Sequence, residues 1–551
     1  MRQFLIFSLL LFTAGISATA QTSAKTDQFL ASSFDSILNK EFKAGEPGAT
    51  AIVVRKGQVI YKKAIGMADV ELNVPLQTDM IFRIGSITKQ FTAVAILQLA
   101  EQGKLSLQDD IKKYIPELPF KETITVEQLL NHTSGIVSYT NKSDFPAKMR
   151  TDMKPMEIIH LTSKDTLEFK PGTKWNYNNT GYIILGYIIE KLSGKTYEEY
   201  VQQNLFAPAG MSNSYYGSES KIIKNRSKGY EKEKDAFQNS DYISMTLPYA
   251  AGSLLSTVED LWKWNKALHS YKLIKKEWLD KATTPYILPN GKSTRYGYGL
   301  SINLVQGSKA IEHGGGIPGF LTDAIYLPAE DVFVAVFSNC DCKSPDNITY
   351  KMAALAIGKP LNFNAIPVSE TDAKAYEAVY VNEEGEERVI RYANGKLSSK
   401  RGGGTQFVIE KFAKDKFFFE NSVSIIEFTR DKSGAVESLI FKSNTEESTW
   451  KKSSKPLPSA VTFITVDASV LAGYVGNYTL APGFILTVTH EGSQLFAQAT
   501  GQQRFELQAI SKTMFQTKGV DAKIEFKQNA EGKTESLVLY QGGREMPAKK
   551  E

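Results

Sequence analysis

The chain contains few residues of the kinds that cross-link a protein or hold a metal ion. Among its 551 residues are two cysteines, Cys340 and Cys342, and five histidines. Cysteines one residue apart rarely close a disulfide, and two of them are too few ligands for a metal cage. The histidines form no His-Glu-x-x-His pattern, which argues against a metalloenzyme. We therefore expect no metal site, and we expect packing to stabilise the fold.

An excess of charge of one sign is also absent. The chain has 65 lysine and arginine residues against 60 aspartate and glutamate residues, a formal net charge of +5, and both signs are spread along its length. Proteins that bind nucleic acids normally carry a concentrated basic face, so we expect no nucleic-acid partner. The hydrophobic fraction of 42% is ordinary for a globular protein and is sufficient for a large core.

Long apolar segments are missing except near the N-terminus. The run FLIFSLLLF, Phe4–Phe12, follows Arg2 and precedes the small-residue sequence ATA at Ala18–Ala20. This pattern is typical of a secretory signal peptide, and the run is shorter than the about 20 residues that span a bilayer. We expect residues 1–20 to be removed and the mature protein, without a membrane span, to be periplasmic or secreted. The alternative is a buried N-terminal helix.

Strand-like and helix-like segments are mixed up to about residue 360. The segment GATAIVVRKGQVIYKKAIG predicts a hairpin that turns at Lys56 and Gly57. Two more strand-like segments, FLTDAIYL and VFVAVFSN, begin at Phe320 and Val332. Helices are predicted between these strands, one with an apolar face after Ser86, one after Thr125 and one ending at Gly194. Strands at both ends with helices between them predict a sheet that is closed by distant segments.

The last 180 or so residues are strand-like and repeat. Several pairs of positions share one offset of 98 residues: Tyr376 with Tyr474, Tyr380 with Tyr478, Leu397 with Leu495, Phe428 with Phe526, and Leu439 with Leu537. A constant offset over this length indicates two copies of one β-rich module. Short strands separated by turns are typical of small antiparallel barrels, which we place at residues 373–453 and 468–551, each after a polar, proline-bearing linker.

A serine and a lysine three positions apart, Ser86 and Lys89, mark the start of the helix predicted after residue 86. Residues three apart lie on one helical face, and a helix N-terminus favours negative charge on the serine oxygen. A lysine in a desolvated pocket loses proton affinity and can act as a base. The Ser-x-x-Lys pattern recurs at Ser218 and Ser448, so alone it also fits a polar helix start followed by a solvated lysine.

Two further patterns carry polar or bare groups that suit catalysis. Tyr177 and Asn179 form a Tyr-x-Asn set at the start of a helix, although Tyr-x-Asn also occurs elsewhere in the chain. His313 is followed by three glycines, Gly314 to Gly316, at the end of a strand-like run. Consecutive glycines leave bare backbone that a substrate can approach, with N–H donors aimed at an oxyanion. The alternative is a plain turn before the next strand.

The order SITK, YNN and HGG resembles that of the penicillin-recognising serine hydrolases, in particular the branch with class C β-lactamases, D,D-carboxypeptidases, related esterases and D-aminopeptidases. The segments LLNHTSGI and AAGSLLSTVEDLWKW are similar to segments common in that branch, and the resemblance covers roughly residues 30 to 360. It implies an α+β fold: an antiparallel sheet flanked by helices plus an all-helical subdomain, over residues 21–360. The two later modules resemble the lipocalin-like barrels of D-aminopeptidases, which partly cover the active site there. Binding to the cell wall or to a partner is the other expectation for them.

The resemblance also implies roles for individual residues. Ser86 would be the nucleophile that becomes acylated. Lys89 would help to remove its proton, with Tyr177 as the shared general base and later proton donor. The substrate would be bound by Asn179, His313 and Gly315, and the oxyanion hole would be formed by the backbone N–H groups of Ser86 and Gly316. Such chemistry requires no cofactor.

The resemblance indicates the substrate class less directly than the catalytic residues. Many lactamases and peptidases of this kind carry lysine in place of His313, and an imidazole is only partly charged at neutral pH. A weaker hold on a substrate carboxylate argues against an efficient β-lactamase. We expect a peptidase or amidase that acts on small D-amino-acid or cell-wall-derived substrates, with an esterase or a weak β-lactamase as alternatives. A non-catalytic penicillin-recognising wall sensor is the alternative from another class.

Overall fold

The structure is a computed structural model that describes residues 28–551, apart from 163–164, 235, 362, 421, 445, 459–462, 482–483, 501, 503, 519–521 and 542–543. The predicted signal peptide, residues 1–20, lies outside the described residues. The chain divides into two compact units, Met1–Asn362 and Phe363–Glu551. In the described part of the chain, no helix is both long and apolar enough to cross a membrane.

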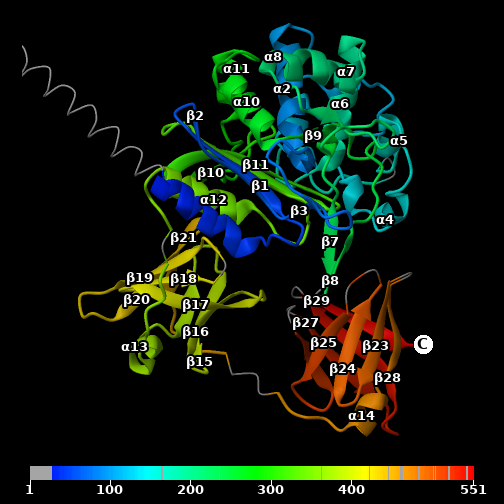
Figure 1. Ribbon diagram of the computed structural model, residues 1–551. Coiled ribbons are helices and arrows are strands. Elements are labelled where there is room, and N and C mark those ends of the chain that lie inside the picture. Colours follow the sequence, from blue (N-terminus) through cyan, green and yellow to red (C-terminus); the bar gives the residue numbers. More distant parts are fainter. Residues whose placement is uncertain are drawn as a thin grey trace, which may run out of the picture. The chain divides into compact units, whose positions relative to one another are not determined.

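A six-stranded antiparallel sheet organises the first unit (Figure 1). Its strands, in spatial order, are β10 (Ser301–Val305), β11 (Ser308–Ile317), β12 (Phe320–Leu327), β13 (Val332–Ser338), β1 (Ala49–Arg55) and β2 (Gln58–Ile65). A strand from the start of the unit, β1, pairs with a strand from its end, β13, and Ala49 lies opposite Ser338. The prediction of a sheet closed by distant segments is therefore confirmed. The hairpin of β1 and β2 turns as predicted at Lys56 and Gly57, which both have positive φ.

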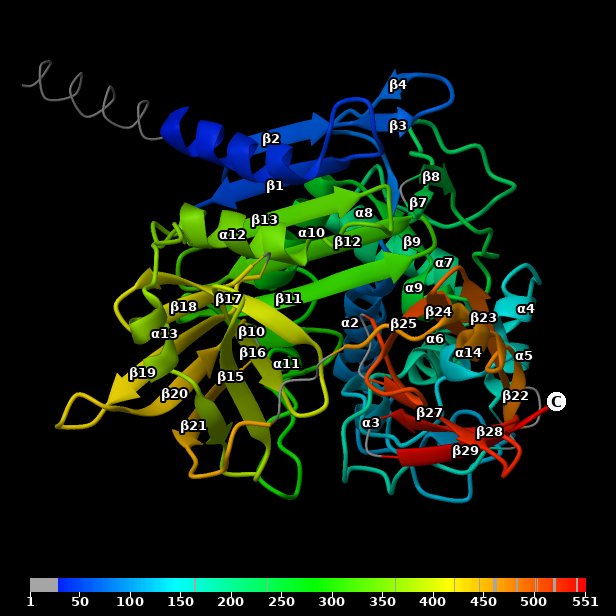
Figure 2. The ribbon, with the colours of Figure 1, turned by 90° about the horizontal axis from the view of Figure 1, so that it is seen from below.

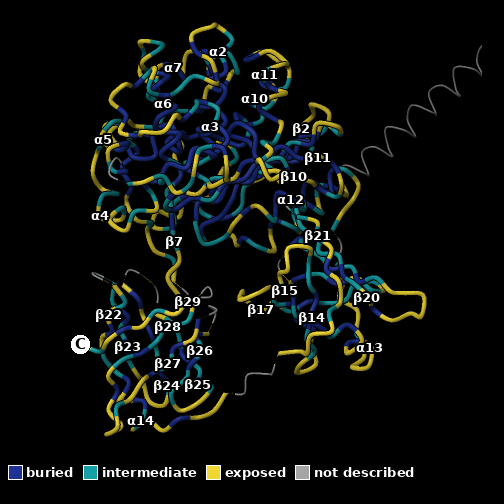
Figure 3. Tube along the Cα trace, turned by 180° about the vertical axis from the view of Figure 1, so that it is seen from behind, coloured by how far each residue is buried: buried dark blue, intermediate teal, exposed yellow. Residues whose placement is uncertain are grey.

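Helices cover both faces of this sheet (Figure 2). Helix α12 (Asp346–Ala356) packs against β12 and β13 on one face, and α10 (Val258–His269) packs against β13 and β1 on the other. Beyond α10 lies a helical region in which α2 (Thr88–Glu101) contacts α6 (Asn179–Ser193) and α9 (Tyr249–Gly252). The buried residues of the first unit gather in its interior, whereas exposed residues concentrate in loops (Figure 3).

Local sequence signals set the limits of these helices. A capping box of Thr125 and Gln128 opens α3 (Val126–Leu130), the helix predicted after Thr125, and α6 ends at Gly194, which has φ 70°. One expectation is corrected: α2 is buried on almost all sides instead of on one apolar face. The reason is its position between other helices, which the 3.6-residue pattern cannot report.

Shorter elements complete the first unit. They are β3 (Met67–Asp69), β4 (Val74–Pro75), β5 (Phe82–Arg83), β6 (Tyr215–Tyr216), β7 (Tyr230–Glu233), β8 (Ala236–Asn239), β9 (Leu254–Ser256), α4 (Phe145–Lys148), α5 (Pro155–His160), α7 (Tyr197–Val201), α8 (Ala207–Ala209) and α11 (Lys276–Ala282).

The second unit contains two closed barrels of eight strands each, which confirms the two predicted copies. The first consists of β14 (Ala378–Val381), β15 (Glu387–Ala393), β16 (Lys396–Arg401), β17 (Gln406–Ala413), β18 (Lys416–Phe419), β19 (Ile425–Arg430), β20 (Val436–Lys442) and β21 (Glu447–Lys452), after helix α13 (Glu370–Ala375). The second consists of β22 (Gly476–Ala481), β23 (Phe484–Glu491), β24 (Gln494–Ala499), β25 (Arg504–Ala509), β26 (Met514–Thr517), β27 (Ala522–Gln528), β28 (Thr534–Gln541) and β29 (Arg544–Lys550), after α14 (Ala468–Ala472).

Even small contacts recur in the two barrels. The Tyr380 hydroxyl donates to the Tyr376 carbonyl oxygen at 2.8 Å, and the Tyr478 hydroxyl donates to the Tyr474 carbonyl oxygen at 2.7 Å. The repeated tyrosines that revealed the repeat in the sequence therefore have one structural role in each copy.

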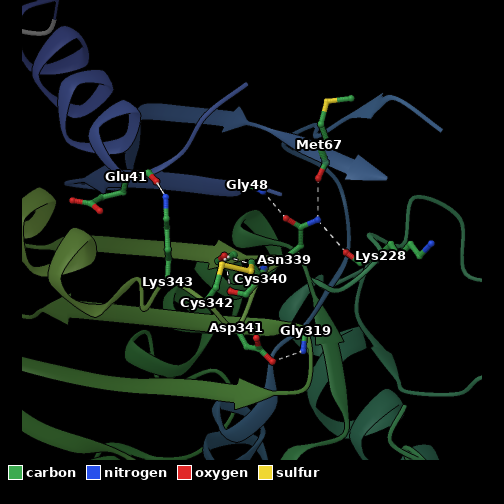
Figure 4. Close-up of a disulfide and its surroundings, with 11 residues drawn as sticks. Glu41, Gly48, Met67, Lys228, Gly319, Asn339, Cys340, Asp341, Cys342 and Lys343 are labelled. Carbon is green, nitrogen blue, oxygen red and sulfur yellow. Dashed lines mark hydrogen bonds between the residues drawn. A yellow bond between two sulfur atoms is a disulfide. The ribbon is translucent and has the colours of Figure 1, made fainter. Parts of the chain in front are cut away.

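The expectation for the cysteines is wrong, because Cys340 and Cys342 form a disulfide just after β13 (Figure 4). The turn there brings their Cα atoms to 5.2 Å, within the range that a disulfide spans. Close spacing in sequence therefore does not prevent the bond. Next to it, the Asn339 side chain accepts from the Gly48 N–H and donates to two backbone carbonyls, while Asp341 accepts from the Gly319 N–H.

Candidate active site

Ser86 and Lys89 meet where the short turn η1 (Gly85–Ile87) leads into α2. The Lys89 Nζ atom lies 3.1 Å from Ser86 Oγ. The same amine donates to Asn179 Oδ1 at 2.8 Å and to the Ala251 carbonyl oxygen at 2.9 Å. Lys89 is fully buried. The structure therefore brings three predicted site residues together, because Ser86 and Asn179 both contact the amine of Lys89.

The surroundings of Lys89 favour its neutral form. Burial lowers the pKa of this amine well below its usual value. In the part of the chain that the structure describes, no carboxylate forms an ion pair with it to offset this effect. A neutral amine has two hydrogens and one lone pair. Because Asn179 Oδ1 and the Ala251 carbonyl can only accept, they take both hydrogens, and the lone pair remains for the Ser86 hydroxyl.

Tyr177 joins this group from the loop before α6. Its ring centroid lies 4.7 Å from Lys89 Nζ, and the two residues after it anchor the helix start. Asn178 caps α6 by accepting from the Gly181 N–H, and the Asn179 N–H donates to Ser138 Oγ. These bonds fix the position from which the phenol projects.

The Tyr177 hydroxyl is buried and, among the described residues, has no hydrogen-bond partner of standard geometry. Burial raises its pKa, and the nearby Ser86 hydroxyl lowers it by less. The phenol is therefore protonated at neutral pH and faces Ser86 with an unused polar atom.

The glycines of β11 allow this strand to lie directly against the serine segment. A Cβ atom at Gly315 would lie 2.0 Å from the Ile84 carbonyl oxygen, and one at Gly85 would lie 2.9 Å from Gly316 N. No side chain fits at either position. The Thr322 hydroxyl of β12 donates to the same Ile84 oxygen at 3.0 Å and holds the two segments together. The backbone of Gly316 thus lies next to that of Gly85, beside Ser86.

His313 belongs to the same strand, but its ring is buried and both of its nitrogens are hydrogen-bonded. Its Nδ1–H donates to the Gly314 carbonyl oxygen at 2.6 Å, so Nε2 accepts from the Tyr296 hydroxyl at 2.9 Å. Burial is the main cause that lowers the pKa of His313 to about 3. The imidazole is neutral at pH 7, which corrects the expectation of a partial charge.

Several residues of the site are not among those that the sequence assigns to it. Ala251 contributes only its carbonyl, although it lies in the segment AAGSLLSTVEDLWKW that supported the resemblance. His132 accepts from the Asn178 N–H through Nδ1 at 3.2 Å and packs against Tyr177, with ring centroids 4.4 Å apart. Its ring also lies 4.7 Å from that of Tyr296. Neither Tyr296 nor the role of His132 follows from a motif.

The remaining Ser-x-x-Lys serines lie elsewhere. The Ser218 hydroxyl contacts Ser220 on the surface, and Ser448 belongs to the first barrel, where it accepts from the Trp450 indole N–H. Among the residues that the structure describes, no group of three or more histidine, cysteine, aspartate or glutamate side chains could hold a metal ion.

Comparison with known proteins identifies the class that this fold and site define. The family model "Beta-lactamase" matches residues 25–358, so the chain belongs to the β-lactamase family and is a serine hydrolase. A second model, a domain of unknown function (DUF3471), matches residues 462–550, which include the second barrel. The predicted fold class, a β-lactamase/transpeptidase-like domain followed by two barrels, is thereby confirmed.

Individual relatives agree with this assignment. Penicillin-binding protein 4* of Bacillus subtilis is 25% identical over 72% of this chain and 93% of its own length. The octameric penicillin-binding protein homologue from Pyrococcus abyssi is 27% identical, with a TM-score of 0.53 over 78% of this chain and all of that one. A D-stereospecific amidohydrolase from Streptomyces is also 27% identical, with a TM-score of 0.51 over 60% of this chain and 98% of that one.

Proposed function

We propose that the protein is an exported amidase or peptidase that acts through a covalent acyl-serine intermediate. Ser86 Oγ attacks the substrate carbonyl and passes its proton to the neutral Lys89 amine. Tyr177 relays this proton from Lys89 to the leaving group, and in deacylation it relays a proton from the attacking water back to the neutral Lys89 amine. The N–H groups of Ser86 and Gly316 stabilise the oxyanion. The observation that carries this proposal is the hydrogen bonding of Lys89, which leaves one lone pair for Ser86.

The substrate proposal depends on His313. Both of its nitrogens are engaged and its ring is neutral, so it offers no positive charge to a substrate carboxylate. We therefore favour small amides and peptides of D-amino acids, including fragments of cell-wall peptides, whose recognition does not require a free carboxylate at this position. Similarity to a D-stereospecific amidohydrolase supports this choice. Esters and β-lactams are the alternative substrates, with β-lactams the poorer ones. A non-catalytic wall sensor is the alternative from another class.

Export and domain limits belong to the same proposal. Residues 1–20 would direct export to the periplasm or the medium. Residues 21–360 would form the hydrolase domain, and 373–453 and 468–551 the barrel modules. Asn179, His313 and Gly315 would line the substrate site.

Replacement of the serine tests the site. We expect Ser86→Ala to abolish hydrolysis of p-nitrophenyl acetate and labelling by a fluorescent fluorophosphonate, because both need the nucleophile. Ser218→Ala, which alters a partly exposed serine with the same spacing to a lysine, serves as the control and should retain both. Full activity of Ser86→Ala would disprove the assignment, and absence of any covalent adduct with the wild type would favour the sensor.

A substrate panel separates the alternatives. Purified protein should release ammonia from D-amino-acid amides faster than from the L-isomers, and it should hydrolyse nitrocefin slowly. Faster turnover of nitrocefin than of every amide would contradict the amidase proposal while leaving the acyl-serine mechanism intact.

A further inference from the structure

The two barrels share strand order and pairing but differ at one end of their interiors. Ile390 pairs with Ser399 in the first barrel, and the equivalent Val488 pairs with Ala497 in the second. The constant offset of 98 residues therefore relates structurally equivalent positions, and one barrel can serve as a reference for the other.

At one end of the first barrel, polar and aromatic side chains replace small or aliphatic ones. The equivalent pairs are Arg388 and Leu486, Ser399 and Ala497, Phe441 and Leu539, and Trp450 and Ala548. The second barrel closes with leucine and alanine at these places. The fold therefore does not need a guanidinium here, and its presence in the first barrel calls for another explanation.

Arg388 points into the first barrel, on the same face of β15 as the buried Ile390, and is only 4% exposed. Its Nη1 donates to Ser399 Oγ at 3.1 Å. The guanidinium carbon lies 4.3 Å from the ring centroid of Phe441 and 4.8 Å from that of Trp450. Within the described part of the chain, Arg388 Nε has no hydrogen-bond partner.

In the part of the chain that the structure describes, no carboxylate balances this buried charge directly. The nearby carboxylates, Glu386 and Glu446, bind Arg401 at 2.7 and 3.0 Å instead, and no ion pair of Arg388 occurs among the described residues. Burial, together with the charge of Arg401, lowers the pKa of Arg388 to about 10. Burying an unpaired charge is costly, so an anion that accepted from the guanidinium would be stabilising.

At this end of the barrel, an aromatic side chain is also exposed to solvent. Phe407 pairs with Ser399 across β16 and β17 and lies on the same inward face as Ile409, yet it is 55% exposed. Its ring centroid lies 6.4 Å from that of Phe419, which in turn lies 5.8 Å from that of Phe441. Aromatic rings thus lead from solvent toward Arg388.

We propose that this end of the first barrel, with Arg388, Ser399, Phe407, Phe441 and Trp450, binds a small organic carboxylate with an aromatic or aliphatic body. The planar guanidinium presents donors that match a carboxylate, and the rings accommodate the apolar part of the ligand. The second barrel, with leucine and alanine at the equivalent positions, does not bind it. The site consists of residues of the first barrel alone, and it does not depend on the function proposed for the serine site.

Calorimetric titration of the full-length protein with 3-phenylpropanoate tests the proposal. The neutral analogue 3-phenylpropanol reports the apolar contribution alone. We expect the wild type to bind the carboxylate and Arg388→Leu, which introduces the residue of the second barrel, to bind it about tenfold or more weakly. Binding of the alcohol should be the same for both proteins.

Arg504→Leu is the matched control. Arg504 also stacks on an aromatic ring, with its guanidinium carbon 3.7 Å from the Phe496 centroid, but it is exposed and paired with Glu491. This variant should bind the carboxylate like the wild type. Equal carboxylate binding by the wild type and Arg388→Leu, including no binding by either at millimolar concentration, would overturn the proposal.

If Arg388→Leu fails to fold, Phe407→Ser provides the test, because it alters an exposed ring. Weaker binding of 3-phenylpropanoate at an unchanged melting temperature would support the site, and unchanged binding would overturn it.

Discussion

At Lys89, burial and hydrogen bonding act on a single amine. Burial keeps its pKa low, and the two acceptors Asn179 and Ala251 orient its hydrogens. Acylation of Ser86 requires the neutral amine, and the neutral fraction of an amine increases as pH rises through its pKa. The acid limb of kcat/KM should therefore follow the pKa of Lys89, at a pH far below that of an ordinary lysine.

Asn179→Asp tests this assignment by adding a negative charge where Oδ1 now lies 2.8 Å from the amine. An adjacent carboxylate favours the ammonium form, so the pKa of Lys89 should rise by about 1–3 units. We expect the acid limb of kcat/KM for p-nitrophenyl acetate to move to higher pH by the same amount. Thr140→Val, which removes a hydrogen-bond partner of Asn179 without a change of charge, should leave the limb in place. A limb that does not move in Asn179→Asp would exclude Lys89 as its origin.

The sequence predicts a site residue when its side chain belongs to a recognisable motif, and it does not when the residue acts through its backbone. Ser86, Lys89, Tyr177 and Asn179 lie in short patterns, and the structure brings them together. Ala251 acts through its carbonyl, which every residue has, so no side-chain pattern marks it. For His313 the residue type suggested partial charge, but the neutral state comes from burial and from Tyr296, which only the folded chain brings near.

At the scale of elements, strand β11 and turn η1 are held at backbone contact. The contact is possible because Gly85 and Gly315 have no side chains. The Thr322 hydroxyl stabilises it by donating a hydrogen bond to the Ile84 carbonyl oxygen. Three consecutive glycines indicated bare backbone from the sequence alone. Which glycine touches which segment is visible only in the register of β11 and β12, where Gly315 pairs with Thr322.

Neighbouring glycines of β11 should therefore respond differently to the same substitution. In Gly315→Ala the new Cβ would meet the Ile84 oxygen at 2.0 Å, and we expect a loss of about 3 kcal/mol or more in the free energy of unfolding together with loss of esterase activity. In Gly314→Ala the nearest atom lies at 3.5 Å, an ordinary contact, and stability should stay within about 1 kcal/mol. Chemical denaturation of both variants checks the difference. Equal stability of the two would show that the strand can move away from η1.

The turn after β13 shows a limit of reasoning from spacing. The spacing of Cys340 and Cys342 predicts no bond between them, but the turn of the chain places their Cα atoms 5.2 Å apart, within disulfide range. Pairing depends on the backbone path, which a count of intervening residues does not give.

At the scale of the whole molecule, the sequence predicted the number and kind of parts because a repeat is visible without knowledge of contacts. The fixed offset between Tyr376 and Tyr474 was sufficient to predict two barrels. The difference between their interiors was not predicted, since it depends on which residues face inward at one end. Arg388 becomes unusual only when the register aligns it with Leu486.

Separate hydrophobic cores make the parts of the chain separable in principle. Among the described residues, the large core cluster of the first unit contains residues between Ile52 and Phe337 and none from the barrels, and each barrel has its own cluster. Because no buried side chain of the first cluster is contributed by the barrels, a chain that ends at Asn362 should fold by itself. We expect it to melt in one cooperative transition and to hydrolyse p-nitrophenyl acetate with kcat/KM within a factor of about three of the full chain. Circular dichroism melting and the ester assay measure both properties, with Ser86→Ala in the truncated chain as the control for background. A truncated protein that folds but has lost its Ser86-dependent activity would mean that the barrels contribute to the site, and one that does not fold would refute the independence of the first core.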